Sequence, residues 1–114
     1  MLSKELNLKL IELLPEIRKA YDEEVSWQEG DETGSHTVFG DVFYPYICEN
    51  ANNEDVTKRN FLVIEKILAL HDEYADEVIT FSVLESLYYD ECISNNIVES
   101  MGDMAKEIFT KFQE

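Results

Sequence analysis

The sequence predicts an all-α fold: a single compact domain over residues 1–114, with five to seven mostly antiparallel helices. Apolar residues recur three and four positions apart along most of the chain, which is the spacing of one helix face. Glycine and proline are scarce, at 4 and 2 residues, and this disfavours a β-fold built on many tight turns. With 45% apolar residues, the chain can bury a core despite a net charge of −16.

The first third of the chain predicts two helices and a loop. Ser3 is a suitable N-cap, and Leu6 and Leu10 begin the apolar stripe of the first helix. Pro15 suits the first turn of a second helix that ends near Trp27, although the same proline could instead kink one continuous helix. The polar stretch 28–35, with two glycines, predicts a loop.

Residues 36–50 are open to two interpretations. Val38, Val42 and Tyr46 are spaced four residues apart, as on one helix face. The β-branched and aromatic content would also suit a strand, and Pro45 interrupts either structure. The number of positions that fit the helical spacing favours a helix.

The second half predicts a long central helix followed by shorter ones. Asn53 or Asp55 can cap a helix that runs to about His71, and its apolar positions cover more than a narrow stripe. A helix over about 73–89 follows, and Asp72 or Asp76 can cap it. Residues 90–96 predict a turn or weak helix, 97–101 a short apolar patch, and 102–112 a last helix.

One motif occurs twice. The pattern F-x-V-[I/L]-E-x-[I/L] begins at Phe61 and again at Phe81, which predicts that two successive helices present similar faces. A helical-repeat origin would explain it, and so would the similar composition of helical cores. Glu65 and Glu85 stand inside these apolar segments and need partners. Either each caps another helix or meets a cation or a tyrosine hydroxyl, or Glu85 belongs to an exposed stripe with Ser82 and Tyr89.

The charge pattern is the main indication of function. Residues 67–105 contain no lysine or arginine but nine carboxylates, and residues 15–35 carry a further charge of −5. Soluble domains normally intersperse both signs, so a surface of one sign predicts a strongly basic partner. The candidate partner-binding residues are the carboxylates and tyrosines at the two ends of the predicted 73–89 helix, with one glutamate between them: Asp72, Glu73, Tyr74, Asp76, Glu77, Glu85, Tyr88, Tyr89, Asp90 and Glu91.

Several functions are disfavoured. The acidic surface repels phosphates, so we expect no binding to nucleic acid or membranes. No metal-binding, nucleophile or phosphate-loop motif occurs, and we therefore expect no enzyme activity, metal or cofactor. The chain opens with no export signal, which predicts a cytoplasmic protein whose Cys48 and Cys92 are reduced, packed thiols. The sequence leaves the oligomeric state open.

Three short motifs resemble those of a known group. The segments SHTVFGD from Ser35, F-x3-E from Phe61 and SVLESL from Ser82 look like small helical bacterial immunity proteins of toxin loci, including contact-dependent growth inhibition and polymorphic toxin systems. The resemblance spans about residues 12–110. It implies cytoplasmic neutralisation of a cognate toxin domain by tight binding, but it supplies no contact residues.

The resulting hypothesis is an immunity protein that occludes a basic toxin surface. A nuclease is the favoured toxin, because nuclease domains are basic to hold phosphates. Two alternatives remain at this point: a nucleic-acid mimic that inhibits DNA-binding defence proteins, and a helical adaptor or scaffold. A mimic would bind several unrelated DNA-binding proteins, whereas an adaptor would expose an apolar groove and show little salt dependence.

Overall fold

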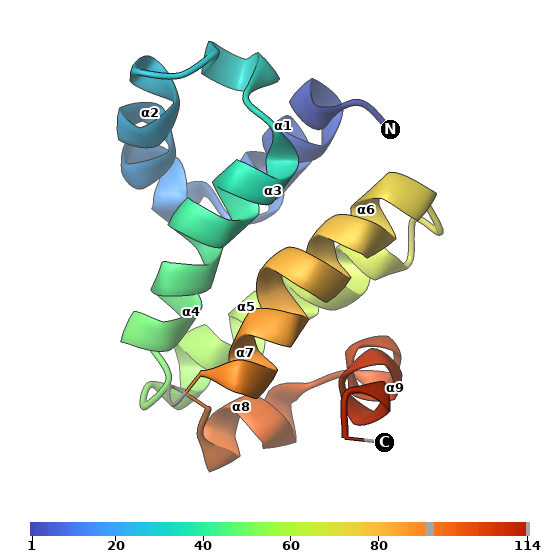
Figure 1. Cartoon of the computed structure of the whole chain (residues 1–114). Coiled ribbons are helices and arrows are strands. Elements are labelled where there is room, and N and C mark those ends of the chain that lie inside the picture. Colours follow the sequence, from blue (N-terminus) through green and yellow to red (C-terminus); the bar gives the residue numbers. More distant parts are fainter. Residues whose placement is uncertain (91–92, 114) are drawn as a thin grey trace.

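Helices account for most of the chain in this computed structural model, which describes residues 1–90 and 93–113. Within these residues there are seven helices and no strand, so the predicted all-α fold is confirmed. Figure 1 shows their arrangement. Two of the seven carry two labels each because a π-helical segment joins their halves. The helices are α1 (Ser3–Leu13), α2 (Arg18–Ser26), α3–α4 (Ser35–Val38 and Tyr44–Glu49), α5 (Glu54–Leu68), α6–α7 (Glu73–Val78 and Glu85–Tyr89), α8 (Asn95–Ser100) and α9 (Asp103–Lys111).

The two joined helices meet at their π-helical segments. Phe39–Phe43 links α3 to α4, Ile79–Leu84 links α6 to α7, and the two segments pack against each other. Both are rich in buried side chains. The helix predicted over 36–50 is therefore confirmed, and Pro45 lies in the first turn of α4, just after the π segment. The altered hydrogen-bond register there accommodates a residue that has no backbone N–H.

Pro15 separates two helices rather than kinking one. Leu14 leaves the helical region with φ −136° and ψ 68°, and a 3₁₀ turn over Pro15–Ile17 leads into α2. The predicted N-cap of α1 was wrong by one residue, because Leu2 takes that position. Its N–H donates to Glu5 Oε1 at 2.9 Å, while Ser3 directs its hydroxyl towards Tyr74.

Helix α5 is central, as predicted, and contacts α6, α8 and α9. Asn53 caps it by accepting a hydrogen bond from Val56 N at 3.2 Å, which confirms one of the two expected caps. The helix ends at Leu68, three residues before the predicted end. His71 has a φ of 52°, so the chain reverses there and α6–α7 returns antiparallel to α5 (Figure 1).

The repeated motif is only partly repeated in space. Its valine and both branched aliphatic positions are buried in each copy, but Phe61 is fully buried whereas Phe81 is 54% exposed. The backbone explains the difference, since the first copy lies in the α-helix α5 and the second spans the π segment before α7. The hydrogen bonds of a π-helix span five residues instead of four, and this shifts the direction of the side chains. The two helices therefore do not present the same face.

Glu65 caps the last helix, as one of its two expected roles predicted. Its Oε1 accepts from Met104 N and its Oε2 from Ala105 N, both at 3.0 Å. These are N–H groups of the first turn of α9, which have no partner within the helix. Ala105 and Phe109 then bury the apolar face of α9.

The prediction for the cysteines was wrong for Cys48, which is disulfide-bonded. Cys92 and Glu91 lie outside the described residues. Among the described residues, no helix is long and apolar enough to cross a membrane.

Candidate functional site

The predicted partner-binding residues lie along one helix but do not form one surface. Glu73 and Glu77 are exposed near its start, and Tyr89 and Asp90 are exposed at its end. Five others are partly buried: Asp72, Tyr74, Asp76, Glu85 and Tyr88. Of these, Asp72, Tyr74 and Tyr88 make polar or ring contacts within the molecule. The structure therefore separates the set into exposed and partly buried side chains, and three of the partly buried ones join segments of the fold.

Asp72 is a structural residue. It caps α6 by accepting from Ala75 N at 2.9 Å, as one of the two expected caps, and its other oxygen pairs with the amine of Met1 at 2.9 Å. The hydrogen bond from that amine, followed by the one from Ala75, holds the pKa of Asp72 below its usual value. A carboxylate engaged in this way contributes little to a partner.

Tyr74 joins a buried polar network at the start of α1. Its hydroxyl lies 2.8 Å from Ser3 Oγ and accepts from Ser35 N at 3.3 Å. Ser35 Oγ in turn donates to Asn7 Oδ1 at 2.8 Å. His36 packs edge-on against the Tyr74 ring and lies 2.6 Å from Ser82 Oγ through its Nδ1. Tyr74 therefore fixes α1, α3 and α6 to one another.

Asp76 is the least satisfied of the predicted residues. Burial raises its pKa, and its Oδ1 has no hydrogen-bond partner. It lines a shallow hollow of about 430 Å³ between the ends of α5, α6 and α9, together with Leu68, Met104 and Lys111.

The other end of the helix is also tied into the fold. Tyr88 stacks on Phe112 and meets Phe109 edge-on, with ring centroids 5.9 and 5.8 Å away. The Tyr44 hydroxyl donates to Asp90, and burial, with that hydrogen bond, raises the pKa of Tyr44. Tyr89 remains 74% exposed.

A second acidic surface lies elsewhere, between α2 and the α3–α4 helix. A groove of about 390 Å³ opens there, which we call the α2–α4 groove. Ile17, Ala20, Val42 and Pro45 form its apolar floor. Five carboxylates and two aromatic side chains complete it: Glu16, Glu23, Glu24, Asp41, Glu49, Trp27 and Tyr46. Trp27 is 71% exposed at the groove.

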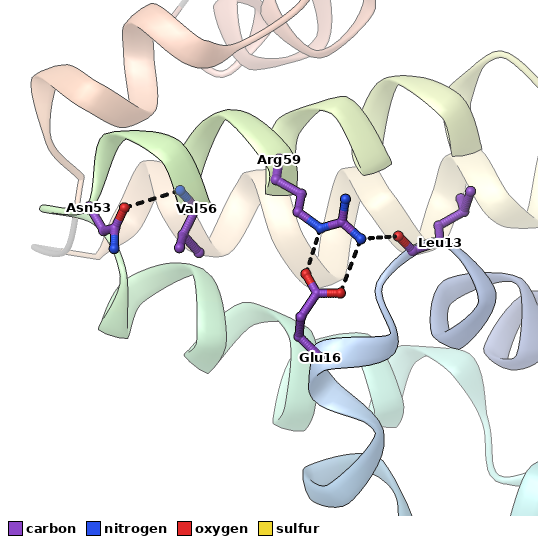
Figure 2. Close-up of polar contacts among 5 residues, drawn as sticks. All are labelled: Leu13, Glu16, Asn53, Val56 and Arg59. Atoms are coloured by element: carbon purple, nitrogen blue, oxygen red, sulfur yellow. Dashed lines mark hydrogen bonds and ion pairs between the residues drawn. The ribbon is translucent and has the colours of Figure 1, made fainter.

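One carboxylate of the α2–α4 groove already holds a guanidinium (Figure 2). Arg59 of α5 donates from Nε and Nη2 to the two oxygens of Glu16, the second at 3.0 Å, and Nη2 also donates to Leu13 O at 3.2 Å. The hydrogen bond from Arg59 lowers the pKa of Glu16. Burial, and then the nearby Glu16 charge, raises the pKa of Tyr46.

Sequence reasoning missed this groove, although part of the signal was available. The excess of acid over residues 15–35 was visible, and Glu23 and Glu24 belong to it. The other wall comes from Asp41 and Glu49, about twenty residues further along the chain. Only the packing of α2 against the π segment before α4 brings the two walls together.

The described residues contain no group of three or more His, Cys, Asp or Glu side chains placed to hold a metal ion. Five carboxylates line the α2–α4 groove, but they form no such group.

Comparison with known proteins identifies a family but no function. No curated protein and no solved structure matches the chain. One family model, described as a domain of unknown function (DUF7674), matches residues 7–114. Because this match covers nearly the whole sequence, the chain belongs to the DUF7674 family.

Proposed function

We propose that this protein is a cytoplasmic immunity protein, which binds a cognate bacterial toxin domain and neutralises it by covering a basic surface. We propose a nuclease as the toxin, because a nuclease must present cations to bind phosphates. One observation carries the proposal: the large excess of carboxylates that the fold leaves without a cation.

The excess follows from the ion pairs. Of the chain's 25 aspartates and glutamates, those that the structure describes in ion pairs are Glu12, Glu16, Asp22, Glu54 and Asp72. Within residues 67–105, which contain no lysine or arginine, Asp72 is paired with the amine of Met1. Repulsion among the remaining charges destabilises the isolated fold, and a basic partner relieves it. Exposed carboxylates such as Glu73 and Glu77 would also steer a basic partner towards the protein and accelerate association.

The disulfide at Cys48 bears on the proposed location. Disulfides are uncommon in reducing cytosol, so the disulfide at Cys48 counts against a cytoplasmic location. The cytoplasmic location rests on the proposed role, because an immunity protein acts where the toxin reaches its substrate.

The direct test is co-expression with the toxin. The gene immediately upstream is expected to encode an exported protein with a basic C-terminal domain, and this domain is expressed in cells with and without the present chain. We expect growth arrest by the domain alone, rescue by the chain, and an isolable complex whose association rate falls with added salt. Toxicity that persists with the folded chain present would refute the proposal.

A second arm separates an immunity protein from a nucleic-acid mimic. The chain is also co-expressed with toxin domains from unrelated loci, and its inhibition of unrelated DNA-binding proteins is measured in vitro. An immunity protein protects against its own toxin alone. Broad inhibition would instead indicate a mimic.

A further inference from the structure

We propose that the α2–α4 groove is the anchoring site of the complex, where a basic segment of the partner inserts an arginine side chain against Trp27. This inference rests on the proposed function and adds the location and the recognition chemistry. It moves the main contact away from the α6–α7 helix, where the sequence placed it.

The shape of the groove suits an inserted side chain. Its volume of about 390 Å³ and its apolar floor, including Ile17 and Val42, can receive the methylene stem of a long side chain. Trp27 begins the turn after α2 and leaves most of its indole accessible. It is the chain's single tryptophan, and 71% exposure leaves much of its apolar area without a partner.

The charges of the groove select a cation. Glu23, Asp41 and Glu49 are exposed, and none forms a hydrogen bond or ion pair through its side chain to another described residue. Glu24 accepts only from the neutral amide of Gln28, at 2.7 Å. Four carboxylates of the groove therefore have no cationic partner among the described residues. Insertion of a guanidinium would reduce the repulsion between them.

The protein's own Arg59 shows the chemistry that the groove favours. At one end of the groove it binds Glu16 through two parallel N–H···O contacts, the arrangement that only arginine can provide (Figure 2). A second guanidinium beside Asp41 and Glu49 would repeat it. Arginine also stacks on an indole face, whereas a lysine ammonium is more strongly hydrated.

The binding test uses a defined probe and the full chain. The probe is the peptide acetyl-(Gly-Arg-Gly)₃-amide, the comparison peptide replaces each arginine by lysine, and affinities are measured by isothermal titration calorimetry. Intrinsic fluorescence follows the same titrations, because Trp27 is the single tryptophan. We expect the arginine peptide to change the Trp27 emission and to bind several-fold more tightly than the lysine peptide.

Two variants with the same change of charge locate the binding. The groove variant is Glu23→Gln, Asp41→Asn, Glu49→Gln. The matched control neutralises three exposed carboxylates outside the groove: Glu32→Gln, Glu99→Gln, Glu107→Gln. We expect the groove variant to bind the arginine peptide about tenfold more weakly, because it loses three exposed charge contacts, and the control to lose less than about twofold. Trp27→Ala should weaken binding by about threefold.

The same variants are then tested against the toxin domain. The groove variant should dissociate from it faster, while the control should keep the wild-type dissociation rate. Equal losses in the two triple variants, or equal affinity for the two peptides, would overturn the groove assignment. Full protection and wild-type dissociation by the groove variant would overturn it as well, yet would leave the proposed function standing. Loss of protection by the wild-type chain refutes the function itself, whatever the peptide does.

Discussion

Removing the Glu65 cap should weaken the attachment of α9 to α5 and lower the free energy of unfolding of the domain. Both carboxylate oxygens accept backbone N–H groups of α9 at 3.0 Å, and Glu65 reaches them from the last turn of the central helix α5. The bonds are charge-assisted and join segments about 40 residues apart. In Glu65→Gln, one oxygen can still accept, but the charge is lost and the amide group faces an N–H donor that it cannot satisfy.

The magnitude follows from those two bonds. A hydrogen bond to a charged group contributes about 1.5–3 kcal/mol, and Glu65→Gln loses one such bond and weakens the other. We therefore expect the free energy of unfolding to fall by about 2–3 kcal/mol. With an unfolding entropy of about 2.1 cal/mol/K per residue, a chain of 114 residues has about 0.24 kcal/mol/K at its midpoint. The corresponding loss in Tm is about 8–12 °C.

The assay is urea denaturation followed by far-UV circular dichroism, with a thermal melt as a second measurement. The control is Glu85→Gln, at the matching position of the repeated motif, where the glutamate is also partly buried but caps no helix in the described part of the chain. We expect the control to stay within about 0.5 kcal/mol of the wild type. If Glu65→Gln behaves like Glu85→Gln, the cap is not what anchors α9 and the reasoning fails.

Three further predictions test residues around the predicted site. A Cβ on Gly102 would lie 2.5 Å from Glu65 Oε1, so Gly102→Ala should displace the cap and cost about 2 kcal/mol, but much less in a Glu65→Ala background, as a double-mutant denaturation cycle can measure. Burial raises the pKa of Asp76 above its ordinary value of 3.8. The protonated carboxyl therefore contributes stability below pH 3.8, and this contribution is lost as the pH rises through the raised pKa. Asp76→Asn should raise Tm at pH 7 but not below pH 3.8. Asp72→Asn keeps a capping oxygen but breaks the pair with Met1. The fold lowers the pKa of Asp72 and raises that of the Met1 amine from 8.0. The Tm of Asp72→Asn should therefore be lower than that of the wild type between those two pKa values, and equal to it at more acidic or more alkaline pH. A Tm difference that stays constant with pH would contradict the ion-pair assignment.

Local patterns in the sequence predicted the helices well because helix formation depends on near neighbours. The spacing of Val38, Val42 and Tyr46 was sufficient to favour a helix over a strand, and Asn53 and Asp72 were recognisable caps. The π segments had no such signal. They arise where two long helices pack against each other, and the repeated motif therefore misled about the direction of Phe81.

The candidate site was less accessible to prediction because exposure is not a local property. In the sequence, Asp72 stands among acidic neighbours, as a residue that binds a basic partner would. In the fold, the amine of Met1, 71 positions away, neutralises its charge. The sequence predicts Tyr74 and Tyr88 as contact residues, whereas packing directs both into the molecule. In each case the deciding partner lies far away in the sequence.

The sequence by itself determined the all-α class, most helix boundaries and the strongly anionic character, because these follow from periodicity, capping and composition. Tertiary structure alone decided which carboxylates stay free and where they gather. The groove of Glu23, Asp41 and Glu49 beside Trp27 exists because α2 packs against the α3–α4 helix, and no spacing within either helix encodes that approach. The residue type fixes the charge of a side chain, whereas the packing of the helices fixes which charged side chains share a surface.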